Sequence, residues 1–247
     1  MRNRILVADE SQSFLMNVGI LLSRMGFKVI PVENGIEVLK LIKLSSPDVV
    51  MLDTQLAVVD GLTVLKRIKG DRQTAKIPVI MLLPNASSRV ITKCKSLGCS
   101  ACLVKPVKIA VLHEIIQKTI FSNTGTNRKH VRVAFIRKVV ITHKRRHYEL
   151  YAETLSEGGI YVRRIDPFPE GAEVDVELPL KGEGSLRLKG VVIYTKGLFG
   201  DVFKVPPGMA IEFRRLAKSE AKILRDYVED LISEDVLETQ VDPSIER

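Results

Sequence analysis

The chain has 247 residues, of which 45% are hydrophobic and 27% are charged. This composition supports a folded core and argues against general disorder, and the length suits one large domain or two small ones. No apolar run reaches the roughly 18 residues that a membrane-spanning helix needs, and the N-terminus lacks the apolar segment of a secretory signal. With 3 cysteines, an odd number, we expect a protein of the reducing cytoplasm and not a disulfide-linked secreted one.

The formal net charge of +9 is unevenly distributed. Basic residues exceed acidic ones through residues 1–233, whereas residues 234–247 are acidic. A basic body indicates an anionic partner, although charge alone does not distinguish nucleic acid, nucleotide and acidic protein.

Strand and helix patterns alternate through the first half of the chain. Near-continuous apolar runs of strand length lie at 5–8, 29–32, 49–52, 79–83 and 101–104. Between and after them, helical spacing of apolar residues occurs at 14–25, 35–44, 62–68, 88–97 and 107–121. This alternation predicts an α/β domain over residues 1–121, with a doubly wound five-stranded parallel sheet covered on both faces. Its ligand site is expected at the carboxyl ends of the strands.

The pattern changes after this domain. Residues 122–127 are polar and are predicted to be a linker. Six segments rich in β-branched residues follow, at 131–141, 148–154, 159–163, 173–178, 186–194 and 209–213. They predict an antiparallel barrel or sandwich. A helix is predicted over 218–233, which ends a second domain at 128–233, and the acidic tail at 234–247 is expected to be disordered.

Acidic residues follow two of the predicted parallel strands, and a lysine follows a third. Asp9 and Glu10 come directly after the first strand, Asp53 ends the third, and Lys105 follows the fifth. Because the carboxyl ends of parallel strands meet at one edge of a sheet, we expect these side chains to lie together. Carboxylate oxygens suit Mg²⁺, and a lysine supplies a point charge for a phosphoryl group.

This arrangement resembles the receiver domain of two-component response regulators over residues 4–120. The resemblance implies a flavodoxin-like fold in which Asp53 is the phosphoacceptor and Lys105 contacts the phosphoryl group. It implies that Asp9 and Glu10, with Asp53, form the Mg²⁺ site. It also implies a sensor histidine kinase as a partner.

Three positions depart from that family. Leu83 stands where the family has a Ser or Thr whose hydroxyl meets the phosphoryl group, Cys102 stands where it has an aromatic residue, and Ala57 replaces a loop proline. A leucine cannot hydrogen-bond a phosphoryl oxygen, so the usual conformational relay lacks its donor. Two interpretations stay open: phosphorylation of Asp53, or a pseudo-receiver that serves as an interaction module.

Two arginines and a short polar segment stand out in the second domain. Arg128 and Arg132 are separated by four positions, and residues 154–159 read Thr-Leu-Ser-Glu-Gly-Gly just before a predicted strand. Guanidinium groups pair with phosphate and stack on purines, while glycines allow close backbone approach. Together these residues suit a ligand with both phosphate and purine.

This pattern resembles the PilZ domain, the bacterial receptor for cyclic di-GMP, over residues 126–233. The family pattern is Arg-x-x-x-Arg followed by Asp/Asn-x-Ser-x-x-Gly. The resemblance implies a six-stranded antiparallel β-barrel with a terminal helix. It implies cyclic di-GMP binding by Arg128, Arg132, Thr154, Ser156 and Gly159. Thr154 replaces the Asp or Asn of the family, so we expect weakened binding, with a degenerate PilZ fold as the alternative.

These features predict a non-enzymatic bacterial signalling protein that binds cyclic di-GMP, takes input through the receiver and acts through an unknown downstream protein. One alternative is an interaction scaffold that binds neither phosphate nor nucleotide. A DNA-binding response regulator is another, disfavoured because a barrel follows the receiver where a helix-turn-helix would be needed. The basic run 143–147 is interpreted as a solvated hairpin turn, and Cys94, Cys99 and Cys102 as small buried side chains and not ligands of an iron–sulfur cluster.

Overall fold

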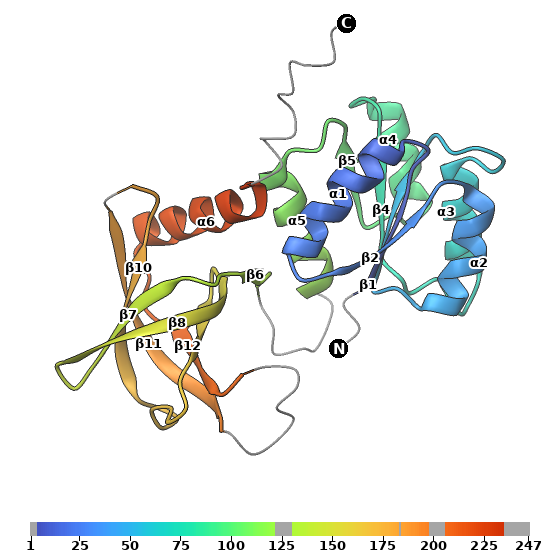
Figure 1. Cartoon of the computed structure of the whole chain (residues 1–247). Coiled ribbons are helices and arrows are strands. Elements are labelled where there is room, and N and C mark those ends of the chain that lie inside the picture. The colour runs from blue at the N-terminus through green and yellow to red at the C-terminus, as the bar shows by residue number, and fades with distance from the viewer. Residues whose placement is uncertain (1–3, 122–129, 183, 198–205, 235–247) are drawn as a thin grey trace, which may run out of the picture. The chain divides into compact units, whose positions relative to one another are not determined.

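The computed structural model describes residues 4–121, 130–182, 184–197 and 206–234 (Figure 1). The chain divides into two compact units, the second of which is His130–Ile232. The predicted linker at 122–127, most of the predicted acidic tail and Arg128 lie outside the described residues. Within the described residues, no helix combines the length and apolar character needed to cross a membrane.

The first unit is a parallel sheet between layers of helices (Figure 1). Its strands are β1 (Arg4–Ala8), β2 (Lys28–Val32), β3 (Val49–Asp53), β4 (Val79–Leu83) and β5 (Ala101–Val104), in the order β2-β1-β3-β4-β5. Its helices are α1 (Gln12–Arg24), α2 (Gly35–Ser45), α3 (Gly61–Gly70), α4 (Ser88–Ser96) and α5 (Ile109–Phe121). The predicted doubly wound five-stranded sheet is confirmed.

The apolar runs at the centre of the sheet form strands that are buried on both faces. Every residue of β3 and β4 is buried, so these strands have no polar face. Alternate side chains of the central strands, such as Leu6, Val50 and Met81, pack with Val38 of α2 and Val64 of α3 in one hydrophobic cluster. The intervening side chains point to the opposite face. The sheet therefore holds its strand ends rigidly, and the functional side chains follow those ends.

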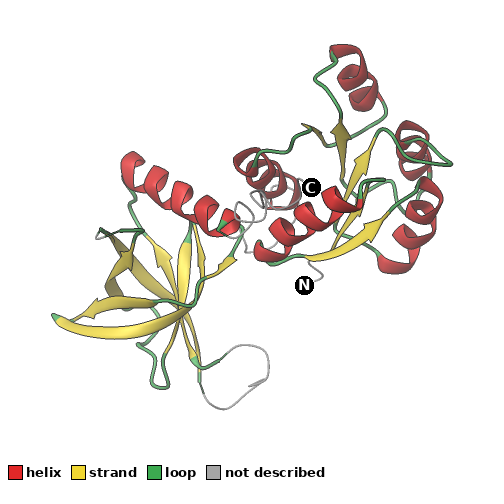
Figure 2. Cartoon of the chain, turned by 45° about the horizontal axis from the view of Figure 1, so that its top comes forward, coloured by secondary structure: helices red, strands yellow, loops and turns green. Residues whose placement is uncertain are grey.

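The second unit is an antiparallel barrel with a helix beside it (Figure 2). Its strands are β6 (Val133–Ala134), β7 (Lys138–His143), β8 (Arg146–Ser156), β9 (Gly159–Arg163), β10 (Glu173–Pro179), β11 (Ser185–Lys196) and β12 (Gly208–Phe213). Strands β8, β7, β10, β11, β12 and β9 pair in that order, and the pairing of β9 with β8 closes the barrel. Helix α6 (Lys218–Ser233) follows. The predicted six-stranded barrel and terminal helix are confirmed.

The sequence predicted one continuous strand at 131–141, and this prediction is wrong. The structure divides it into β6 and β7, which both pair with β8. The register shifts between the pairs Ala134–Thr154 and Lys138–Tyr151, where three residues of one segment oppose two of the other. An extra residue of this kind is a β-bulge, which bends a strand and disrupts its ladder. Residue types alone did not indicate the bulge, because all of them suit a strand.

Candidate functional site

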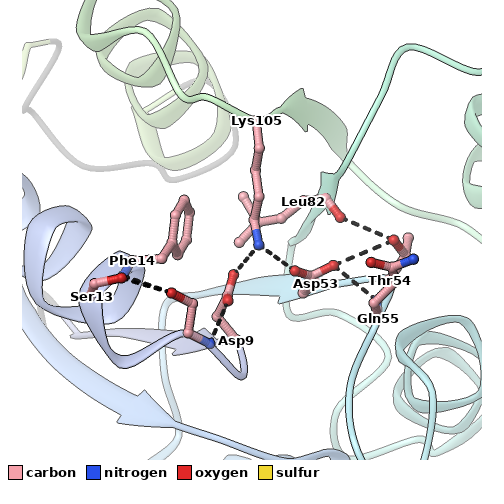
Figure 3. A network of polar contacts seen from close by, with 9 residues as sticks. Asp9, Ser13, Phe14, Asp53, Thr54, Gln55, Leu82 and Lys105 are labelled. Carbon is pink, nitrogen blue, oxygen red and sulfur yellow. Dashed lines mark hydrogen bonds and ion pairs between the residues drawn. The ribbon is translucent and has the colours of Figure 1, made fainter.

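Three charged side chains meet at the carboxyl ends of β1, β3 and β5 (Figure 3). The Lys105 ammonium lies 2.5 Å from Asp9 Oδ2 and also forms an ion pair with Asp53 Oδ2. Both carboxylates are buried, with Asp9 2% and Asp53 5% exposed. The predicted convergence of Asp9, Asp53 and Lys105 is therefore present in the structure, although the residues lie far apart in the sequence.

Backbone contacts fix each of these residues. The Lys105 N–H donates to the Leu83 carbonyl at 2.8 Å, which continues the pairing of β5 with β4. The Ser11 N–H donates to Asp9 Oδ1 at 3.0 Å, and the Gln55 N–H donates to Asp53 Oδ1 at 2.9 Å. Each carboxylate thus has one oxygen held by a backbone donor and the other facing the lysine, so the site is pre-organised.

A glycine brings helix α3 against the backbone of Asp53. A Cβ at position 61 would lie 1.8 Å from the Asp53 carbonyl oxygen, so only glycine fits there. Asp60, which precedes it, accepts hydrogen bonds from the Leu62 and Thr63 N–H groups, each at 3.1 Å, and caps the helix. The Asp-Gly pair therefore has a clear structural role beside the candidate phosphoacceptor.

The charges of the site perturb one another. Burial, the largest influence, raises the pKa of Asp9, and the nearby Asp53 carboxylate adds to this, while contacts with Lys105 and the Ser11 N–H only partly offset it. Burial acts to lower the pKa of Lys105, but its hydrogen bonds and ion pairs with Asp53 and Asp9 outweigh it, so that pKa is raised. The lysine is therefore held as a cation between two carboxylates.

The predicted metal ligands are only partly brought together. Asp9 and Asp53 converge, but the Glu10 side chain is exposed. Among the described residues, no group of three or more His, Cys, Asp or Glu side chains is placed to hold a metal ion. The chemistry of Asp9 and Asp53 nevertheless fits a divalent cation. When both are ionised they carry two negative charges, of which Lys105 neutralises one. Their carboxylate oxygens are also ligands that Mg²⁺ prefers.

The three departures from the receiver pattern differ in their surroundings. Leu83 is completely buried in the hydrophobic cluster beneath the site. Cys102 is half-buried, and Ala57 is exposed. No hydroxyl stands at position 83, and an apolar side chain fills the core there instead.

Two residues that contact the site were not predicted from the sequence. The Thr54 hydroxyl lies 3.4 Å from Asp53 Oδ1 and 3.4 Å from the Leu82 carbonyl oxygen. The Lys105 ammonium lies 4.4 Å from the centre of the Phe14 ring, within range of a cation–π contact. Thr54 could have been found as a hydroxyl next to the acidic residue, whereas nothing in the sequence placed Phe14 near Lys105.

In the barrel, the turn between β8 and β9 carries the predicted Ser-x-x-Gly residues. Ser156 is 6% exposed, and its hydroxyl donates to the Gly159 carbonyl at 3.1 Å. A Cβ at position 159 would lie 2.3 Å from the Ile211 carbonyl oxygen of β12, so the close approach of that strand requires glycine. Ser156 and Gly159 are therefore brought together, and both help to build the turn.

The other predicted ligand residues lie on the strand next to this turn or outside the described residues. Thr154, half-buried, pairs with Ala134, and Val133 pairs with Leu155. Arg132 directly precedes β6, and its side chain is partly exposed. The structure thus brings Arg132, Thr154, Ser156 and Gly159 to one end of the barrel.

Two long-range contacts hold the turn in place, and the sequence did not indicate them. A Cβ at position 158 would lie 2.5 Å from Cδ2 of His130, so the imidazole packs on the face of Gly158. The Arg225 Nε of α6 forms an ion pair with Glu157 Oε2 at 3.0 Å. Because His130 lies two positions before Arg132, its contact ties the start of the described segment of this unit to the turn.

The basic run at 143–147 lies at the other end of β8. It forms the hairpin between β7 and β8, with Lys144 at φ 48° and Arg145 at φ 63°, and the Arg145 side chain is exposed. Positive φ at both central residues is the geometry of a tight hairpin turn. This agrees with the interpretation as a hairpin, away from the Ser156 turn.

Comparison with known proteins matches both units to families. Residues 5–117 match the response regulator receiver domain, and residues 126–230 match the PilZ domain. A two-component response regulator-like protein, APRR1 of Arabidopsis thaliana, is 31% identical over 109 residues, which are 43% of this chain and 18% of that protein. The polar-differentiation response regulator DivK of Brucella anthropi is 28% identical over 117 residues, covering 47% of this chain and 95% of DivK.

Among solved structures, a putative response regulator of Chloroflexus aurantiacus aligns with 49% of this chain and 98% of its own, at 22% identity and a TM-score of 0.47. Each of these three alignments covers less than half of this chain, and the APRR1 alignment spans less than a fifth of that protein. The two family matches follow one another along the chain and agree with the two folds. The chain therefore consists of a response regulator receiver domain, residues 5–117, followed by a PilZ domain, residues 126–230.

Proposed function

We propose that this protein is a bacterial signalling protein of the cytoplasm that binds cyclic di-GMP through residues 128–233. Its input comes through residues 1–121, by phosphorylation of Asp53 or by protein contact. Its output passes through contacts with a downstream protein, and it catalyses no reaction of its own on a substrate. The proposal rests on the succession of a receiver domain and a PilZ domain in one chain.

The observation that carries the cyclic di-GMP proposal is the register of β6 with β8. Val133, which follows Arg132, pairs with Leu155, which precedes Ser156, and the turn beyond it needs glycine at position 159. Cyclic di-GMP has two phosphates and two guanines, and a guanidinium offers charge, a bidentate fork and a stacking plane together. Arg132 and Arg128 would bind phosphate and guanine, while Ser156, Gly159 and Thr154 would supply hydrogen bonds and close backbone approach.

Cyclic di-GMP binding is tested by isothermal titration calorimetry of the full chain. We expect saturable binding that is lost with Arg132→Ala, while the same titration with guanosine monophosphate gives no comparable heat. Equal affinity of wild type and the Arg132→Ala variant would contradict this assignment of the site.

For the receiver, we propose that Asp53 accepts a phosphoryl group from a histidine kinase or a small acyl phosphate. A carboxylate oxygen of Asp53 attacks the phosphorus, and the bond from phosphorus to the donor atom breaks, with the electron pair leaving on the donor. Lys105, already within contact of Asp53, would pair with a phosphoryl oxygen. The two backbone N–H groups at Ser11 and Gln55 hold the carboxylates in place during the transfer.

Mg²⁺ would be held by Asp9 and Asp53, with the exposed Glu10 as a further candidate ligand, and when bound it would neutralise phosphoryl charge. Lys105 already bridges both carboxylates, so a cation between them must compete with its ammonium. We therefore expect weak Mg²⁺ binding. A thermal-melting series should show a small Mg²⁺-dependent rise in wild type and none in Asp53→Ala.

A second candidate function for the first domain is a pseudo-receiver that binds a partner without phosphorylation. The buried Leu83 favours it, because the position of the family hydroxyl is taken by a core side chain. Treatment with acetyl phosphate and Mg²⁺ distinguishes the two: a mass gain of one phosphoryl group that is absent in Asp53→Asn supports phosphorylation. No mass gain in wild type supports the pseudo-receiver.

A further inference from the structure

Two of the three cysteines are in direct contact at the start of β5. The Cys99 and Cys102 sulfur atoms lie 3.7 Å apart, and both residues are half-buried. Cys99 is fixed by its N–H, which donates to the Cys94 carbonyl at 3.1 Å at the end of α4, after Gly98 with φ 89°. Cys102 is fixed in the sheet, where it pairs with Met81 of β4. The two thiols thus face one another from a helix-ending turn and a strand.

We propose that Cys99 and Cys102 form a redox-sensitive dithiol that a peroxide oxidises to an intramolecular disulfide. One sulfur, as the thiolate, attacks a peroxide oxygen, so that the O–O bond breaks and a sulfenic acid forms. The second sulfur attacks the sulfenic sulfur, the S–S bond forms, and water leaves. With hydrogen peroxide, two thiols lose two electrons and two protons, and the peroxide is reduced to two molecules of water.

Geometry and exposure select this pair from the three cysteines. Cys94 lies on α4 and is completely buried in the hydrophobic cluster, away from an oxidant in solution. Its thiol contacts Cys102, so it is the competing partner for the bond. Cys99 and Cys102 combine sulfur contact with partial exposure, and their spacing of two intervening residues is that of a Cys-x-x-Cys dithiol. The bond would join the turn before β5 to the strand that leads into Lys105.

Burial and nearby charges change the pKa of Cys99 and therefore affect the rate of oxidation. Burial, which is the largest influence, and the neighbouring Cys102 and Cys94 together raise the pKa of Cys99 to about 12, although the positive charge of Lys95 on α4 acts in the opposite direction. The ammonium of Lys69 on α3 also interacts with Cys99. Because the thiolate is the reacting species and burial disfavours it, oxidation should be slow at neutral pH and faster in alkaline buffer.

The test is mass spectrometry of the full chain after incubation with hydrogen peroxide in non-denaturing buffer. We expect the mass of two hydrogens to be lost, with recovery on addition of dithiothreitol, and a proteolytic map that links Cys99 to Cys102. The rate should increase severalfold from pH 7 to pH 8. Cys94→Ala should keep the linkage, whereas Cys99→Ser and Cys102→Ser should each lose it.

Because the wild-type map needs no substitution, the proposal can fail even if a variant does not fold. A disulfide that includes Cys94, a disulfide between two chains, a gain of oxygen without loss of hydrogen, or three intact thiols after prolonged treatment would each overturn it. Circular dichroism of the variants separates loss of the bond from loss of the fold. None of these readouts depends on phosphorylation or on cyclic di-GMP.

Discussion

The two candidate sites of this chain are built in opposite ways. In the receiver domain, charged side chains at three strand ends make the site, and they contact one another directly through Lys105. In the PilZ domain, backbone and glycine contacts make a closed turn, and Arg132 directly precedes the strand that pairs with β8 before this turn. The first site is thus a set of charges on a rigid sheet, and the second is a shaped surface that a ligand must complete. We therefore expect substitutions to affect one site without the other.

The largest effect is expected at Asp53. Asp53→Asn removes the nucleophilic carboxylate, so the mass gain after acetyl phosphate treatment should be abolished while cyclic di-GMP affinity stays unchanged. Asp71→Asn, at the end of α3 and paired with Lys43, is the matched control and should still be phosphorylated. A phosphorylated Asp53→Asn variant would place the acceptor elsewhere.

At the second site, Arg132→Ala should weaken cyclic di-GMP binding by about 2–4 kcal/mol, because a charge-assisted fork and a stacking plane are lost together. Arg132→Lys should restore little, since lysine keeps only the charge. Arg187→Ala, an exposed β11 arginine paired with Glu177, removes the same charge and should bind as wild type does. Full affinity of the Lys variant in calorimetry would mean that simple electrostatics suffices.

The shape of the PilZ turn can be tested without removing any charge. Gly158→Ala adds a methyl group that would lie 2.5 Å from the His130 ring, so the ring must shift, and His130 lies two positions before Arg132. We expect roughly tenfold weaker cyclic di-GMP binding, about 1.4 kcal/mol. Gly197→Ala, where nothing lies within 4 Å of the added carbon, is the control. Unchanged binding by Gly158→Ala would show that the His130 contact does not position the ligand residues.

The receiver site should respond to pH through Asp9. Burial raises its pKa above the ordinary value of 3.8, so the folded state binds this proton more tightly than the unfolded state does. Its contribution to stability is therefore fully present below about pH 3.8 and is lost as pH rises through the folded-state pKa. In metal-free buffer, the free energy of unfolding of Asp9→Asn should therefore increase relative to that of wild type as pH rises through the folded-state pKa. The increase should be on the order of 1 kcal/mol. A constant difference from pH 3 to pH 7 would contradict the raised pKa.

The smallest effect is expected at Thr54, the hydroxyl between Asp53 and the Leu82 carbonyl. Thr54→Val removes one weak hydrogen bond, so the lifetime of the phosphorylated protein should change by about fivefold, roughly 1 kcal/mol. Thr54→Ser should behave as wild type. The decay of the phosphorylated mass over time measures both, and identical lifetimes for all three proteins would remove Thr54 from the site.

The difference between the sites also explains what the sequence could predict. Asp9, Asp53 and Lys105 were predictable because each follows an apolar strand, and parallel strands bring their carboxyl ends to one edge. The burial of each carboxylate was not predictable: Asp9 is buried, whereas the adjacent Glu10 side chain is exposed. In the barrel, Ser156 and Gly159 were predicted by their spacing, but the His130–Gly158 and Arg225–Glu157 contacts join positions far apart in the chain. No local pattern encodes such pairs.

Calorimetric titration of the full chain with cyclic di-GMP, with and without Mg²⁺ and beryllium fluoride as a phosphoryl mimic, tests the central claim most directly. The account predicts saturable binding in both conditions. It also predicts that the two affinities differ by less than about tenfold, or 1.4 kcal/mol, because Leu83 and Cys102 replace the residues through which the receiver family reads its phosphoryl group. Absence of binding would contradict the proposed function of the PilZ domain. A larger change in affinity would contradict the independence of the two sites.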